Sequence, residues 1–84
     1  MYYLYILKCA DKSFYTGIAK DLDKRIEKHR TGKGSKYVYS RLPVDLIYTE
    51  NFADKSGALK REMEIKSWKR EKKIEILKLE KFIL

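Results

Sequence analysis

The sequence predicts an α+β fold, in which a small antiparallel three-stranded sheet is flanked by helices in the order ββαβαα. β-rich runs occupy residues 2–9, 14–19 and 44–52. Helical periodicity bounded by capping residues marks residues 22–31 and a longer stretch after residue 54. The 84 residues show no internal repeat and no linker, so we expect a single domain, 1–84, built around one hydrophobic core.

The first two β-rich runs, Tyr2–Cys9 and Phe14–Ala19, are separated only by the turn residues Ala10–Ser13. Such closeness in sequence favours an antiparallel hairpin. The first run is rich in Tyr, Leu and Ile, which is typical of a strand buried on much of both faces. Gly17 in the second run indicates either a β-bulge or a place where another backbone or a ligand comes close. The third strand is Val44–Phe52.

Capping residues set the expected helix ends. Asp21 is a good N-cap and Gly32 a good terminator, which places the first helix at about residues 22–31. The next helix is expected to begin at Asp54 or Ser56 and to run to about Trp68. A basic stretch, Lys69–Lys73, then leads into a last helix. That last helix carries Ile74, Leu77 and Phe82. Residues 35–41 receive no assignment.

The composition excludes several classes of protein. A chain that is 44% hydrophobic and 38% charged, with four glycines and one proline, is a folded globular protein. The single cysteine, Cys9, rules out an internal disulfide and a thiolate metal cluster, and it fits a reducing, cytoplasmic setting. The apolar start, Met1–Leu7, is too short to span a bilayer, so we expect no targeting signal and no membrane association.

Positive charge dominates and is uneven. The net charge is +8, and residues 20–41 hold eight Lys or Arg against three acidic residues. A concentrated positive field attracts polyanions and speeds their encounter. Nucleic acid is therefore the first partner to expect, and DNA the first candidate.

Tyr5 and Tyr15 lie ten residues apart in the predicted hairpin, and Arg25 lies ten residues further on. This spacing resembles the GIY-YIG nuclease family. Its first motif is met by Leu4-Tyr5-Ile6-Leu7 and its second by Tyr15-Thr16-Gly17. Leu22–Ile26 looks like the helix that carries the family's arginine, and Arg61–Lys66 looks like its metal-binding glutamate segment. The resemblance covers nearly the whole chain, and it is closest to the small stand-alone branch, which has no well-defined biological role.

The resemblance implies a divalent-metal-dependent endonuclease that hydrolyses phosphodiesters in DNA repair or nucleic-acid processing. It implies Tyr5 or Tyr15 as general base and Arg25 as phosphate clamp. It also implies Glu62 as the single protein ligand of a weakly bound Mg²⁺ or Mn²⁺, whose other ligands are waters and phosphate oxygens. Glu64 competes for the metal role, but Glu62 shares a helix face with Ala58 and Ile65.

A tyrosine base needs an unusual pKa, because free tyrosine has a pKa of about 10. Positive charge from Arg25, a protonated His29 and the metal would lower that pKa. His29 follows Arg25 by one helical turn on the same face. We therefore expect His29 at the edge of the site, where it either hydrogen-bonds a tyrosine or acts as an alternative acid or base.

Further nucleic-acid contacts are expected from basic side chains and from a tyrosine that can stack on bases. They are Lys24, Lys28, Lys33, Lys36, Tyr37, Arg41 and Lys66. We interpret the Lys69–Lys73 run as a solvated face.

The sequence departs from the family at the glycine of the first motif and at an asparagine that often follows the metal glutamate. Residues 70–84 contain no Asn, so that asparagine has no counterpart here. Two alternatives stay open. One is a non-catalytic basic nucleic-acid-binding module on the same scaffold, and the other is a protein-interaction domain that uses the last helix. We expect a monomer, with a protein partner left open.

Overall fold

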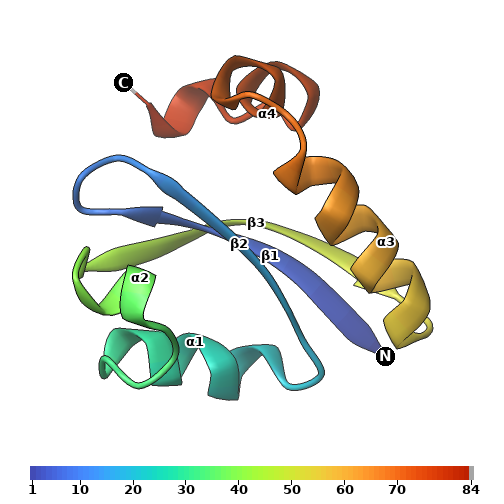
Figure 1. The fold of residues 1–84 in the computed structure, drawn as a ribbon, viewed down its shortest axis with the longest axis horizontal. Coiled ribbons are helices and arrows are strands. Elements are labelled where there is room, and N and C mark those ends of the chain that lie inside the picture. The colour runs from blue at the N-terminus through green and yellow to red at the C-terminus, as the bar shows by residue number, and fades with distance from the viewer. Residues whose placement is uncertain (84) are drawn as a thin grey trace.

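Strand β1 lies in the middle of a three-stranded antiparallel sheet with the order β2-β1-β3. The computed structural model describes residues 1–83 and is drawn in Figure 1. The strands are β1 (Tyr2–Cys9), β2 (Phe14–Ala19) and β3 (Val44–Phe52). The predicted fold class is confirmed, because all three strands have the predicted bounds and helices flank the sheet.

Helices cover both faces of the sheet, which explains why Leu4 to Leu7 of β1 are all buried. On one face, the hydrophobic cluster contains Tyr5 and Leu7 with Ile26 of α1 (Leu22–Arg30) and Val38 of α2 (Lys36–Tyr39). On the other face, a second cluster joins the sheet to α3 (Lys55–Lys66) and to the chain after α4 (Arg70–Ile76). That cluster contains Leu4, Ile6, Ile47, Ile65, Leu77 and Leu79. Figure 1 shows α1 and α2 below the sheet and α4 above it.

The predicted caps define the helix starts. The Asp21 carboxylate accepts a hydrogen bond from the Lys24 backbone N–H at 3.0 Å, and the Asp54 carboxylate accepts one from Gly57 at 2.9 Å. Gly32 adopts φ +83°, a conformation that glycine tolerates, directly after α1. Of the two caps expected for α3, Asp54 is therefore the one used, and α3 ends at Lys66 rather than at Trp68.

Two helical predictions differ from the structure. Residues 36–39, which had no assignment, form α2, and the Ser35 hydroxyl caps it by accepting from the Val38 N–H at 3.1 Å. The predicted last helix is shorter, because Lys78 adopts φ +57° and interrupts it after Ile76. Phe82 lies instead in a separate 3₁₀ turn, Glu80–Phe82, and most of the basic run belongs to α4 itself. Within residues 1–83, no helix is long and apolar enough to cross a membrane.

The sheet's irregularity lies in β3 and not at Gly17. Ile6 pairs with Tyr48 but Leu7 pairs with Leu46, which leaves Ile47 as the extra residue. Ile47 is buried in the cluster beneath α3. Gly17 pairs in regular register with Tyr5, so of the two interpretations of this glycine the bulge was wrong.

Candidate active site

A buried tyrosine–histidine pair lies between the sheet and α1. Tyr5 on β1 and His29 on α1 are each only 1% exposed. The Tyr5 hydroxyl oxygen lies 2.8 Å from His29 Nε2, within hydrogen-bond distance. The two groups are 24 residues apart, and they meet because α1 packs on the face of the sheet to which Tyr5 points.

Gly17 and Gly34 make room for this pair because they have no side chains. A Cβ at Gly17 would lie 2.6 Å from the Tyr5 hydroxyl oxygen, and a Cβ at Gly34 would lie 2.3 Å from His29 Nδ1. Both distances are far below van der Waals contact. The close approach expected at Gly17 is therefore made by the phenol of Tyr5, rather than by a backbone or a ligand. His29 Nδ1 is buried and has no hydrogen-bond partner among residues 1–83.

Tyr15 lies on the edge strand β2 beside this pair. Its ring centroid is 6.4 Å from that of Tyr5 and 5.2 Å from that of His29, which it meets edge-on. On its other side, the ring of Tyr37 lies 5.9 Å away. Tyr15 is half-buried and Tyr37 is 39% exposed, so the aromatic cluster leads from the buried Tyr5 to the surface.

The protonation of the pair differs from the expectation. Burial, followed by the proximity of Tyr15, raises the pKa of Tyr5 well above its ordinary value, and the opposing effect of Arg25 is smaller. Burial, with Arg25 second, lowers the pKa of His29 below 6.5. The expectation of a protonated His29 that lowers the pKa of a tyrosine was wrong for Tyr5, because desolvation outweighs the nearby charge. At neutral pH the pair is a phenol and a neutral imidazole.

Arg25 and Glu62 act on Tyr5 from different helices. Arg25, partly buried on α1, lowers the pKa of Tyr5, and the Glu62 carboxylate on α3 raises it. The side chain of Glu62 is only 16% exposed, and its Oε2 pairs with Lys66 Nζ at 3.3 Å. Glu64, the alternative, is 54% exposed and pairs with Arg61 at 2.5 Å. Of the two glutamates, Glu62 is the one whose charge reaches Tyr5.

The residues present fit a hydrated divalent cation better than a caged one. The part of the chain that the structure describes has no group of three or more His, Cys, Asp or Glu that could hold a metal. Glu62, the ligand that the family resemblance implies, would be completed by waters and phosphate oxygens. Mg²⁺ keeps several waters and is usually bound by one or two carboxylates plus substrate phosphates, so this donor set is suitable.

The five lysines predicted to bind nucleic acid fall into three places. Lys24 and Lys28 line the same hollow as Arg25, with a volume of about 210 Å³. Lys33 and Lys36 line a separate hollow of about 340 Å³ with Tyr39. Lys66 lies on the Glu62 carboxylate. The structure thus brings Tyr5, Tyr15 and His29 into contact, with Arg25 and Glu62 near enough to shift the pKa of Tyr5, and it places Lys33 and Lys36 in a separate hollow.

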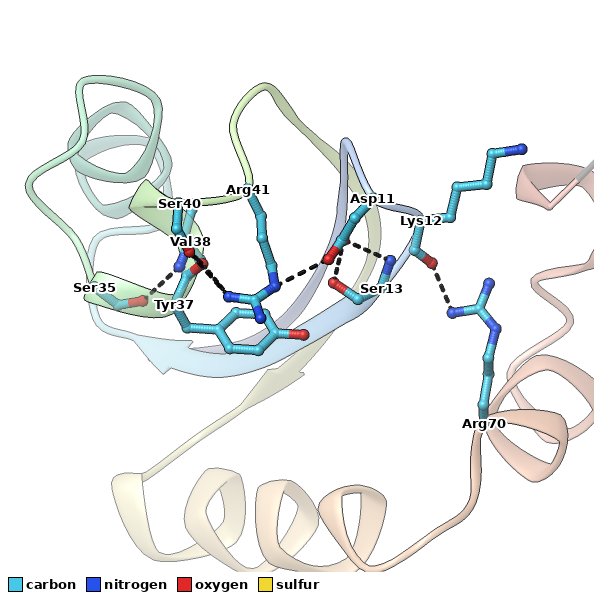
Figure 2. A network of polar contacts seen from close by, with 9 residues as sticks. All are labelled: Asp11, Lys12, Ser13, Ser35, Tyr37, Val38, Ser40, Arg41 and Arg70. Carbon is cyan, nitrogen blue, oxygen red and sulfur yellow. Dashed lines mark hydrogen bonds and ion pairs between the residues drawn. The ribbon is translucent and has the colours of Figure 1, made fainter.

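Tyr37 and Arg41 form a stack beside Tyr15 that the sequence did not reveal as a unit. The Arg41 guanidinium carbon lies 3.8 Å from the centroid of the Tyr37 ring. Its Nε donates to Asp11 at 3.0 Å, and its Nη1 donates to the Tyr37 carbonyl at 3.0 Å (Figure 2). Ser35 before Lys36 was an N-cap signal for α2, but no local pattern connects Asp11 with Arg41.

Comparisons with known proteins show the family of the chain. A family model of the GIY-YIG catalytic domain matches residues 1–83. The chain belongs to the GIY-YIG family. A GIY-YIG domain places it in a nuclease superfamily, and its relatives are UPF0213 proteins, a small stand-alone family that contains this domain.

Two such relatives come from staphylococci. A UPF0213 protein of Staphylococcus saprophyticus is 55% identical over 76 residues, covering 90% of this chain and 93% of the relative. One from Staphylococcus aureus is 52% identical over 77 residues, covering 92% and 94%.

Two solution NMR structures are similar to this GIY-YIG domain. One, of a UPF0213 protein from Bacillus halodurans, has a TM-score of 0.62 and 45% identity, and covers 94% of this chain and 85% of that one. The other, of a protein from E. faecalis, has a TM-score of 0.65 and 37% identity, and covers 99% and 88%.

Proposed function

We propose that this GIY-YIG protein is a divalent-metal-dependent endonuclease that hydrolyses phosphodiesters of nucleic acid, DNA first, in DNA repair or nucleic-acid processing. It acts as a single-domain monomer. The observation that carries the proposal is the buried hydrogen bond between Tyr5 and His29. Arg25 on α1 and Glu62 on α3 both shift the pKa of Tyr5.

The hydrogen bond between Tyr5 and His29 allows a tyrosine with a high pKa to act as a general base. An isolated phenolate would be unfavourable in this buried position, because burial raises the pKa of Tyr5. Neutral His29, with its proton on Nδ1, accepts the Tyr5 proton at Nε2 while the Tyr5 oxygen takes a proton from the attacking water. No free phenolate needs to accumulate, and Tyr5 becomes the general base through His29. Tyr15, which is more accessible, contacts the substrate.

Charge on the reacting phosphate is met by two groups. Arg25 binds the phosphate with its planar guanidinium and stabilises the charge that develops on it. Glu62 holds Mg²⁺ or Mn²⁺, which, when bound, supplies Lewis-acid stabilisation of the same charge. Lys24 and Lys28, which share the Arg25 hollow, bind the neighbouring backbone.

The test is cleavage of labelled single-stranded, duplex, flapped and branched DNA and RNA with Mg²⁺ or Mn²⁺. Glu62→Gln is expected to lower the rate on the order of a hundredfold or more, because several kcal/mol of metal-dependent charge stabilisation are lost. Glu64→Gln, the same change two residues away, is expected to cut at close to the wild-type rate. Circular dichroism and thermal unfolding check both variants. Wild-type protein that leaves every substrate intact overturns the proposal.

The second candidate is a nucleic-acid-binding module without turnover. It is favoured by the net charge of +8 and by the Lys66 ammonium that already pairs with Glu62. Intact substrates, together with binding that weakens steeply with salt, would make this the better function.

A further inference from the structure

The turn between β1 and β2 holds two arginines, one on each side (Figure 2). Arg41, which follows α2, donates from Nε to the Asp11 carboxylate at 3.0 Å. Arg70, the first residue of α4, donates from Nη1 to the Lys12 carbonyl at 2.7 Å. The two side chains come from segments 29 residues apart, and residues 10–13 are their common support.

Each guanidinium also stacks on an aromatic ring. The Arg41 carbon Cζ lies 3.8 Å from the centroid of Tyr37, and that of Arg70 lies 4.2 Å from the centroid of Phe14. A stack and a hydrogen bond together fix the plane of a guanidinium, which lowers the entropy lost when it binds an anion. Phe14 directly precedes Tyr15, and the Tyr37 ring is 5.9 Å from the Tyr15 ring. Tyr15 packs on the face of the sheet that carries Tyr5, and Phe14 packs on the opposite face. The two arginines therefore lie at the same end of the sheet, beside the β1–β2 turn, but on opposite faces of it.

Their charges are only partly compensated. Asp11, which is half exposed, pairs with Arg41. Arg70 forms no ion pair with a carboxylate among residues 1–83, and its partner is a neutral carbonyl. Lys73 adds to this positive region, since burial, followed by Lys66 and Arg70, lowers its pKa, whereas Lys66 is already paired with Glu62. A region of several cations with few carboxylates favours an anion.

We propose that Arg41 and Arg70 form a strand-positioning site, in which the two supported guanidiniums bind backbone phosphates of a nucleic-acid strand that crosses the β1–β2 turn at the edge of the sheet beside Tyr15. The inference rests on the proposed function for the reacting phosphate, and it adds Arg70 as a binding residue in a run that the sequence suggested was only a solvated face. Three guanidinium nitrogens have no hydrogen-bond partner in the described part of the chain: Nη2 of Arg41, and Nε and Nη2 of Arg70. These atoms can donate to phosphate oxygens. Asp11 competes with phosphate for Arg41.

The test measures binding without divalent metal, by fluorescence anisotropy of a labelled DNA oligonucleotide, single-stranded and as a duplex, over a range of salt. Arg70→Gln and Arg41→Gln are each expected to weaken binding about tenfold. Each should also flatten the plot of log affinity against log salt by about 0.7 to 0.9, the contribution of one phosphate contact. Lys60→Gln is the charge-matched control on an exposed position of α3, and it should change both quantities less. Asp11→Asn is expected to strengthen binding about threefold, because Arg41 loses its competitor.

Affinity and salt dependence of Arg70→Gln equal to those of Lys60→Gln would overturn the inference. A second test uses only the wild-type protein, so it stays valid if a variant fails to fold. The arginine Nε–H signals of Arg41 and Arg70 should shift in NMR spectra on titration with the oligonucleotide, and unshifted signals under saturating binding also overturn it. Because no metal is present, binding through Arg70 by a protein that cuts nothing would refute only the proposed nuclease, not this site.

Discussion

The hydroxyl oxygen of Tyr5 lies 2.6 Å from the place that a Cβ of Gly17 would occupy. The two residues are cross-strand partners in the β1–β2 pair, and both are buried. The glycine on the edge strand is therefore part of the candidate site, because its missing side chain sets where the phenol lies.

Gly17→Ala is expected to displace Tyr5 and break its hydrogen bond to His29. Tyr5 is enclosed and its ring has no room to yield, so overpacking should lower the free energy of unfolding by about 2 kcal/mol. Cleavage should fall with it. Denaturant unfolding gives the stability, and the ring ¹⁵N signals of His29 report the broken bond. Unchanged stability with unchanged histidine signals would show that this contact is not tight.

Tyr5→Phe tests the hydroxyl itself. It should lower the cleavage rate by a factor on the order of 10² to 10⁴, the usual contribution of a general base. It should also cost about 1 to 2 kcal/mol of stability, since His29 Nε2 loses its buried partner.

Tyr48→Phe is the matched control for that substitution. It removes another partly buried tyrosine hydroxyl, one hydrogen-bonded to Glu50, and should lower stability without lowering the rate. Equal loss of activity in the two variants would point to a structural role for the Tyr5 hydroxyl.

Stability should fall in mild acid because of His29. Burial, then Arg25, lowers its pKa in the folded protein, so between pH 6.5 and that lower pKa the unfolded chain binds the extra proton. The contribution of neutral His29 to the free energy of unfolding should therefore be fully present above pH 6.5 and should decline as the pH falls below it. Cleavage should decline in the same direction as His29 loses its ability to accept a proton.

His29 is the only histidine of the chain, so its titration can be followed directly by NMR. His29→Gln supplies the reference curve that carboxylates alone produce. A difference in stability between wild type and His29→Gln that stays constant from pH 7.5 to about pH 5 would contradict a buried His29 that is neutral in the folded protein.

Lys66→Met is expected to strengthen Mn²⁺ binding by up to about fivefold, because it removes the cation that pairs with Glu62 at 3.3 Å. The effect is small because the Lys66 side chain is 54% exposed and its charge is screened. Paramagnetic broadening of amide signals around Glu62 measures the affinity. Lys60→Met, on the same helix, should leave it unchanged, and an equal change in both variants would mean that Lys66 acts only through net charge.

Local patterns predicted the elements well where one residue type has one dominant effect. Asp21 and Asp54 cap helices because their carboxylates accept from backbone N–H groups three residues on, a contact within one turn. The strands followed from their β-rich composition. The last helix was predicted too long, because nothing in Leu77-Lys78-Leu79 signals a left-handed residue at Lys78.

The residues of the candidate site could be named from the sequence as a set, but their chemical state could not be predicted. The spacing of Tyr5, Tyr15 and Arg25 can be read directly from the chain, and so can a histidine one turn after the arginine. The direction of the Tyr5 pKa shift depends instead on how completely α1 and the sheet exclude water, and the sequence-based expectation had the opposite sign. Arg70 was overlooked for a similar reason, since its partners Phe14 and Lys12 lie more than 50 residues away.

By itself, the sequence determined the order of the elements, the excess of positive charge and the residue types available for phosphodiester chemistry. Those properties depend on composition and on contacts within a few residues. Only the tertiary structure decided that Tyr5 is paired with a neutral His29, that Glu62 rather than Glu64 acts on it, and that the β1–β2 turn supports two arginines. Burial and long-range contacts set these features, and both arise only when the helices pack on the sheet.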